Sequence, residues 1–142
     1  MRKIVKCDSR DYTALAGIWE RSVRCSHDFL LEEDFRAIKN ALIPDYFPNV
    51  ELYAVDEDGK LTGFIGLSGD KIEMLFVDSD QRGCGFGSEL VDFAMRQGAL
   101  SVDVNEQNRS ALAFYQSKGF RVVSRDAADE AGRPYPILHL SF

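Results

Sequence analysis

A short glycine-rich segment carries the strongest chemical signal in the chain: Arg82-Gly83-Cys84-Gly85-Phe86-Gly87-Ser88. It follows a dense apolar run ending at Val77 and precedes an amphipathic stretch that begins at Ser88. Glycines let a backbone turn so that several N–H groups face one concavity, and a helix behind them adds its positive N-terminal end. Arg82 adds a permanent positive charge. This combination predicts a loop that binds a diphosphate.

Three kinds of phosphate-binding loop can be compared with this segment. A P-loop needs a lysine followed by serine or threonine at its end, and the segment has none. A dinucleotide fingerprint needs a third glycine where Ser88 stands, although Asp103 lies at about the distance of its acidic residue. The third pattern, Arg-x-x-Gly-x-Gly, matches Arg82, Gly85 and Gly87. A glycine-rich turn without a ligand is the remaining alternative at this point.

The elements that must hold this loop can be read from the spacing of apolar residues. Steps of three and four predict helices from residue 12 and over 31–43, 88–97 and 108–118, with Asp8 or Ser9 as a cap and residues 25–29 as an irregular connection. Alternating or continuous apolar runs predict strands over 1–7, 51–55, 61–67, 71–77, 100–104, 120–125 and 137–142. We expect an α/β (α+β) fold in one domain, residues 1–142. Its mixed, mostly antiparallel sheet would have about seven strands flanked by about four helices.

Composition excludes several classes of function. The formal net charge of −6 argues against nonspecific binding to nucleic acid, which needs a positive field. Three widely spaced cysteines and two isolated histidines, His27 and His139, indicate neither a disulfide framework nor a metal site. No apolar stretch is long enough to span a bilayer, and no export signal precedes the first predicted strand. We therefore expect a cytoplasmic protein without a membrane partner.

Two separated segments, LFVDSDQRGCGFGSELV and VDVNEQNRSALAFYQSKGF, resemble the acetyl-CoA signature of the GNAT superfamily of N-acetyltransferases. The segments WERSVRCSHDFL and GRPYPIL further resemble a group of small bacterial members. Two blocks in the right order are more specific than a glycine loop alone. The resemblance implies the GNAT fold, acetyl-CoA as co-substrate, and direct acetyl transfer to an amine of a small molecule or protein. We expect a monomer, or a homodimer formed through an exposed strand edge or the C-terminal strand. The alternatives are a non-catalytic acyl-CoA sensor and, disfavoured by Ser88 and the preceding meander, a dinucleotide-dependent oxidoreductase.

The resemblance also implies positions for the cofactor. The pantetheine arm would lie along Leu75, Phe76 and Val77, and the diphosphate on the backbone amides of residues 82–88. The strand over 100–104 would splay away from 71–77 to admit the cofactor. Asn105 would sit at the mouth of this gap, with Asn108 and Tyr115 on its far side near the thioester sulfur.

Acetyl transfer to an amine needs a proton donor for the leaving thiolate and a group that meets the developing oxyanion. Tyr115 is the leading general acid by resemblance, whereas helical spacing alone would favour a core tyrosine. A backbone N–H of Phe76 or Leu75 could meet the oxyanion.

The general base is less specified by the sequence. Glu73 lies two residues before Leu75, so strand alternation predicts that both share a face. Lys71 shares that predicted face, near the position where some family members carry a catalytic glutamate. His27 is the other candidate, as base or substrate contact, because imidazole titrates near neutral pH. A water relay would need neither residue.

Overall fold

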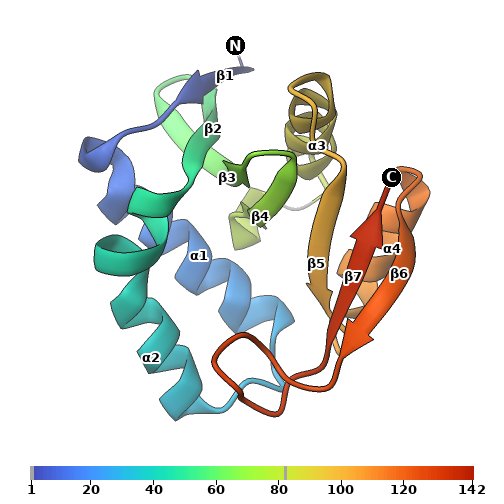
Figure 1. Ribbon diagram of the computed structural model, residues 1–142. Coiled ribbons are helices and arrows are strands. Elements are labelled where there is room, and N and C mark those ends of the chain that lie inside the picture. The colour runs from blue at the N-terminus through green and yellow to red at the C-terminus, as the bar shows by residue number, and fades with distance from the viewer. Residues whose placement is uncertain (1, 82) are drawn as a thin grey trace.

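The computed structural model describes residues 2–81 and 83–142. Within them, seven strands form one sheet in the order β1-β2-β3-β4-β5-β7-β6 (Figure 1). Every pairing is antiparallel except that of β4 with β5. The mixed sheet confirms the predicted fold class. The strands are β1 (Arg2–Lys6), β2 (Glu51–Glu57), β3 (Lys60–Ser68), β4 (Lys71–Val77), β5 (Ser101–Asn105), β6 (Arg121–Asp126) and β7 (Ile137–Ser141).

Helices cover both faces of the sheet and create two apolar cores. The α-helices are α1 (Tyr12–Ser26), α2 (Glu32–Ala41), α3 (Phe86–Arg96) and α4 (Arg109–Ser117). One core joins α1 and α2 to Leu52 and Ala54 of β2, and the other joins α3 and α4 to Val55. Because strand side chains alternate between faces, β2 contributes to both cores. The apolar clusters thus fix α1 and α4 on opposite sides of the same sheet.

Element boundaries differ from the sequence prediction where local hydrogen bonds extend a helix. Helix α1 continues to Ser26, whose hydroxyl donates to the Ser22 carbonyl at 2.9 Å, so only the part of the predicted connection from His27 onward is irregular. Helix α3 starts two residues earlier than predicted, because the left-handed Gly85 (φ 82°) serves as its N-cap. Asp8 caps a short 3-10 turn over Ser9–Asp11, ahead of α1.

Strands β4 and β5 separate soon after they meet. They pair only at Lys71 with Ser101 and at Ile72 with Val102. Beyond these pairs β5 continues against β7 while β4 stays with β3, so a wedge opens towards the carboxyl ends of β4 and β5 (Figure 1). The predicted splay is confirmed. Across the described residues, no helix has the length and apolarity needed to cross a membrane.

Candidate active site

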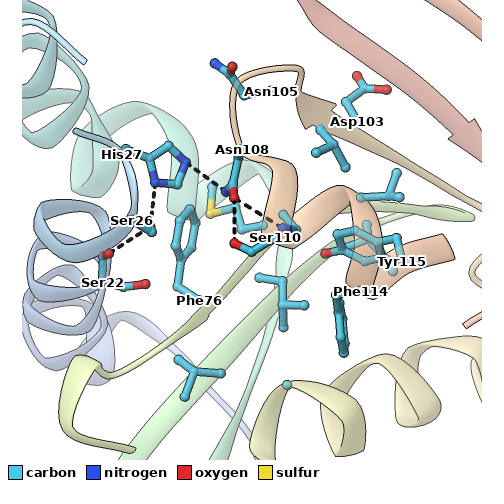
Figure 2. Close-up of a pocket in the computed structure, with 18 of the residues that line it drawn as sticks. Ser22, Ser26, His27, Phe76, Asp103, Asn105, Asn108, Ser110, Phe114 and Tyr115 are labelled. Atoms are coloured by element: carbon cyan, nitrogen blue, oxygen red, sulfur yellow. Dashed lines mark hydrogen bonds between the residues drawn. The ribbon is translucent and has the colours of Figure 1, made fainter. Parts of the chain in front are cut away.

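A pocket of about 510 Å³ occupies the wedge. Strand β4 forms its floor, α4 one wall, and the carboxyl end of α1 the opposite wall (Figure 2). Gly83 and Gly87 of the glycine-rich segment border the same pocket. The topology therefore brings the predicted diphosphate loop, the predicted pantetheine strand and Tyr115 to one cavity.

The glycine-rich segment leaves its amides available to a ligand. Gly83 (φ 80°) and Gly85 (φ 82°) adopt left-handed conformations that other residues rarely take, a pattern typical of anion-binding concavities. Among the described residues, no group accepts a hydrogen bond from the backbone N–H groups of residues 83–88. Arg82, the predicted charge of this loop, lies outside the described residues.

The pocket wall next to the loop has room for a narrow chain. A Cβ added at Gly87 would lie 3.6 Å from Val77 Cγ2 and 3.9 Å from Phe114 Cζ, so the missing side chain leaves space between strand and helix. Open amides beside an apolar channel are the donor set that a diphosphate with a pantetheine arm requires. The residues present therefore fit acetyl-CoA.

Tyr115 is buried on the α4 wall, with only 5% of its surface exposed. Its ring packs edge-on against Phe114 and Phe120. Burial raises the pKa of Tyr115 far above its ordinary value, so the hydroxyl keeps its proton at neutral pH. No other described residue forms a hydrogen bond with this hydroxyl, which points into the pocket in Figure 2. The group is a proton donor without a competing acceptor in the described part of the chain.

His27 faces Tyr115's helix from the opposite wall and belongs to a chain of hydrogen bonds (Figure 2). The single proton of Ser26 Oγ goes to the Ser22 carbonyl, so the 2.7 Å contact with His27 requires His27 Nδ1 to donate. In the neutral ring, Nε2 then carries the lone pair, 3.5 Å from Asn108 Nδ2. This assignment of the tautomer follows from the partners.

Asn108 has its amide orientation fixed by the start of α4. Its Oδ1 accepts from the Ala111 amide and the Ser110 hydroxyl, both at 3.2 Å, which is the role of an N-cap. The Nδ2 group must therefore face His27 as a donor. In the neutral tautomer, His27 Nε2 therefore accepts from Asn108 Nδ2.

Glu73 does not share a face with Leu75, contrary to the expectation from alternation. Gly66 of β3 pairs with Met74, and Leu67 pairs with Ile72, so Glu73 is the extra residue of a β-bulge. Leu75 consequently packs on the α3–α4 core together with Ile72, three residues away. The Glu73 carboxylate still borders the pocket and lies 3.8 Å from Lys71 Nζ.

A chain of alternating charges continues from Glu73 across the uncovered face of the sheet. Lys71 Nζ lies 2.8 Å from Asp103, which also accepts from His139 Nδ1 at 2.7 Å. His139 Nε2 reaches Asp126 at 2.6 Å. Contact with Asp126, and then with Asp103, raises the pKa of His139 above its ordinary 6.5. Paired with carboxylates at both nitrogens, His139 is unsuited to serve as the pocket's base.

The remaining residues predicted to contact the cofactor differ in burial and in hydrogen bonding. Asn105 borders the pocket and uses its Oδ1 to accept from the Gln107 amide at 3.0 Å. Phe86 is buried in the core, and Ser88 accepts a hydrogen bond from Lys118. Cys84 is an exposed free thiol in the loop. Because its ring is buried, Phe86 can reach a diphosphate only through its backbone amide, whereas the Ser88 hydroxyl still has a proton to donate.

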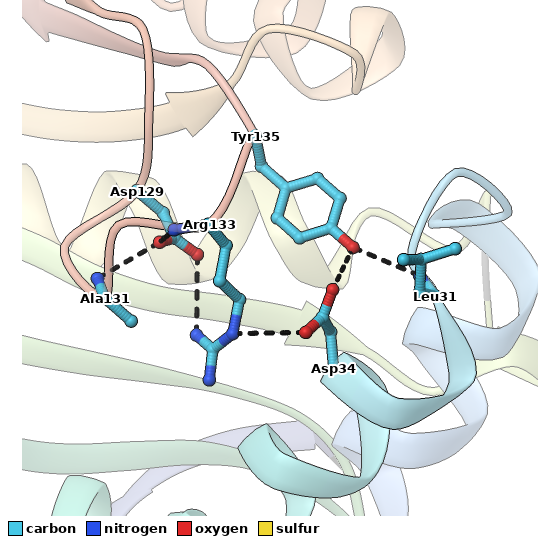
Figure 3. Close-up of polar contacts among 6 residues, drawn as sticks. All are labelled: Leu31, Asp34, Asp129, Ala131, Arg133 and Tyr135. Carbon is cyan, nitrogen blue, oxygen red and sulfur yellow. Dashed lines mark hydrogen bonds and ion pairs between the residues drawn. The ribbon is translucent and has the colours of Figure 1, made fainter.

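The loop between β6 and β7 contacts the N-terminal turn of α2 through polar side chains (Figure 3). The Tyr135 hydroxyl donates to Asp34 in α2 and accepts from the Leu31 amide at 3.2 Å. Arg133 Nε lies 3.4 Å from the other oxygen of Asp34. These contacts fix α2 against a loop about 100 residues further along the chain.

Sequence reasoning missed several residues that line or support the pocket. Ser22 and Ser26 could have been noticed, because serines four apart on a helix share a face with the chain end that carries His27. Ser110 and Phe114 lie four residues apart on α4, which places them on one helix face. The partners of Lys71 had none, since strand pairing brings Asp103 to it.

Comparisons with known proteins agree with this architecture. A family model described as an acetyltransferase (GNAT) domain matches residues 25–134. The peptidyl-lysine N-acetyltransferase YjaB of Escherichia coli (strain K12) is 42% identical over 130 residues, which cover 90% of this chain and 88% of that protein. The solution structure of apo YjaB from Escherichia coli superposes with a TM-score of 0.91 at 35% identity, covering 100% and 97% of the two chains.

A more distant structure shares the fold. PaiA N-acetyltransferase from Thermoplasma acidophilum, solved in complex with coenzyme A, has a TM-score of 0.71 at 18% identity, and the match covers 100% of this chain and 99% of that one. The family model spans well over half of the chain, and YjaB is similar to the chain over most of the length of both proteins. The chain belongs to the GNAT family and is an acetyl-CoA-dependent N-acetyltransferase.

Proposed function

We propose that this protein acetylates the ε-amine of lysine in proteins or peptides, with Tyr115 as general acid. The observation that carries the proposal is the buried Tyr115 hydroxyl, which faces a wedge bordered by the amide-rich loop. The relatives named as peptidyl-lysine N-acetyltransferases support lysine as the acceptor. A lysine side chain is long and thin, which suits entry into the pocket between α1 and α4.

The cofactor would bind along the loop and β4. Amides of residues 83–88, together with Arg82, would hold the diphosphate, and Leu75, Phe76 and Val77 would flank the pantetheine arm. Asn105 and Asn108 would border the arm from the β5–α4 side. Acetyl-CoA supplies an acetyl thioester whose carbonyl carbon an amine can attack.

Groups of the chain would then protonate the leaving thiolate and stabilise the oxyanion. Tyr115 would donate its proton to the departing thiolate. Burial keeps the phenol protonated before the transfer, and the same apolar surroundings disfavour the charged thiolate. A backbone N–H of Phe76 or Leu75 would stabilise the oxyanion. Neither role requires a metal ligand.

The acceptor must lose a proton before it attacks, since a free lysine amine is charged at neutral pH. Glu73 and His27 are the two candidates for this step. Glu73 could first attract the ammonium through its charge, while His27 would offer the Nε2 lone pair that faces Asn108. We keep both roles as proposals that kinetics can separate.

We further propose that residues 1–142 act as one catalytic domain, as a monomer or homodimer in the cytoplasm. Both apolar cores are built on the same sheet, which supports a single folding unit.

A peptide panel tests the acceptor. Purified protein is incubated with acetyl-CoA and matched peptides that carry either a free lysine with a blocked N-terminus or a blocked lysine with a free N-terminus. Mass spectrometry should find one added acetyl group on the lysine peptide only. Acetylation of the N-terminal amine alone would contradict the lysine assignment. Tight binding of acetyl-CoA without turnover on either peptide or on polyamines would favour a sensor.

A further inference from the structure

We propose that Arg2, at the start of β1, is a positioning residue for the cofactor loop. It would orient the peptide group between Cys84 and Gly85 so that the Gly85 N–H is presented to the diphosphate. This inference rests on the proposed cofactor site and assigns a role to a residue far from it in sequence.

Arg2 contacts the glycine-rich loop on both sides of Gly85. Its Nη1 donates to the Cys84 carbonyl at 3.2 Å and to Glu89 in the first turn of α3 at 2.5 Å. The guanidinium carbon lies 4.4 Å from the centroid of the Phe86 ring. One side chain thus contacts the residues before and after Gly85 as well as the helix that follows.

The orientation follows from the geometry of the peptide group. The described peptide bonds include no cis bond, and in a planar trans peptide the C=O and N–H point in opposite directions. Arg2 holds the Cys84 carbonyl, so the Gly85 N–H must point away from Arg2. Among the described residues this N–H has no acceptor, so it remains available to an anion.

Without this contact the loop would lose its preferred arrangement. Gly83 and Gly85 have wide conformational freedom, so the peptides around Cys84 can rotate unless a partner fixes them. Ordering such a loop during binding reduces affinity, whereas a loop held by a charge-assisted hydrogen bond is already arranged. Arg2 also forms an ion pair with Glu57 of β2, with Arg2 Nε 3.3 Å from Glu57 Oε2.

The contact should matter for binding more than for folding. The side chains of Arg2 and Glu57 are 37% and 39% exposed, and ion pairs at such positions add little to stability. Arg2→Ala should therefore fold while its loop samples more conformations. Arg10→Ala is the matched control, because Arg10 is an exposed arginine paired with Asp8 and forms no hydrogen bond or ion pair with the described residues of the loop.

Calorimetric titration with coenzyme A is the decisive measurement. We expect Arg2→Ala to raise the Kd about fivefold to twentyfold, the effect of losing one oriented charge-assisted contact. The KM for acetyl-CoA should rise similarly with kcat unchanged, and Arg10→Ala should match the wild type. Arg2→Lys keeps the charge but lacks the fork and the planar stacking, so its Kd should stay closer to that of Arg2→Ala.

A truncated donor separates loop orientation from general damage. S-acetylpantetheine lacks the diphosphate, so Arg2→Ala should leave its kcat/KM unchanged. An unchanged Kd for coenzyme A, or an equal loss with S-acetylpantetheine in a variant that melts like the wild type, would overturn the role of Arg2. Absence of coenzyme A binding by the wild type would instead refute the proposed cofactor site. Failure of the lysine peptides alone would leave the Arg2 result standing.

Discussion

The side chains of His27 and Asn108 meet across the pocket, with Nε2 and Nδ2 3.5 Å apart, although 81 residues separate them in the sequence. The contact joins the end of α1 to the start of α4, so one asparagine both caps a helix and sets the hydrogen bonding of the histidine. This double role makes Asn108 a point where stability and chemistry can be tested separately.

Replacement of Asn108 should measure how much its capping role contributes to stability. Asn108→Ala removes the cap and should lower the free energy of unfolding by about 1 kcal/mol, whereas Asn108→Ser keeps a capping oxygen and should change it little. Urea denaturation measures both values. If Asn108→Ala proves as stable as the wild type, the cap contributes nothing to α4.

Removal of the Tyr115 hydroxyl should slow the chemical step. Tyr115→Phe keeps the buried ring contacts but cannot protonate the leaving thiolate, so kcat should fall by roughly a hundredfold or more. Coenzyme A affinity, measured by calorimetry, should stay within about twofold of the wild type. Full activity of Tyr115→Phe on a confirmed acceptor would eliminate the acid assignment.

The base can be identified from the pH dependence of kcat/KM. If Glu73 removes the proton, Glu73→Gln should lower the rate at every pH tested, while His27→Gln should keep the wild-type profile. If His27 is the base, the opposite pattern is expected, with the acid limb of the profile lost in His27→Gln. Two variants with wild-type profiles would point to solvent water as the proton acceptor.

The ion pair between Arg21 and Asp78 should stabilise the junction of α1 with the end of β4. Arg21 Nε and Nη2 each donate to Asp78 at 2.8 Å, and the Asp78 side chain is only 3% exposed. Hydrogen bonds from Arg21 lower the pKa of Asp78. Because Arg21 is half-exposed, we expect Arg21→Ala to lower the free energy of unfolding by about 1–3 kcal/mol.

The loss in free energy of unfolding caused by Arg21→Ala should be greater at neutral than at acidic pH. A carboxyl whose pKa is depressed in the folded state contributes stability above its unfolded value, 3.8 for aspartate, and loses it as the pH falls. The difference between wild type and variant in urea denaturation should therefore be larger at pH 7 than at pH 3. An equal difference at both values would show that the charge on Asp78 is not involved.

His139 should contribute stability with the opposite dependence. Asp126 and then Asp103 raise its pKa above 6.5, so its contribution is complete below that value and declines as the pH rises through the folded pKa. The stability gap between wild type and His139→Gln should therefore narrow from pH 6 to pH 9. Lys71, which also pairs with Asp103, stays charged throughout this range. A stability difference that grows with pH would contradict a stabilising role for the protonated His139 ring.

Sequence periodicity located the fold's elements to within a few residues, because buried faces impose regular spacing on helices and strands. Strand β4 has the predicted bounds, and the helices have small shifts that depend on single hydrogen bonds or on one left-handed glycine. The face of Glu73 could not be predicted, since a bulge arises from the pairing of two strands and leaves no mark on either one alone.

The amino-acid sequence alone determined the order of elements and the glycine-rich loop, because each is encoded by residues close together in the chain. Tyr115 is singled out only by the resemblance to a family, since its helical spacing alone favours a core residue. Tertiary structure decided which side chains meet: Arg2 with the loop, His27 with Asn108, and Lys71 with Asp103. The physical reason is distance along the chain. Local patterns record how a segment buries its own apolar face, whereas contacts between remote polar groups exist only after the cores have fixed the elements relative to one another.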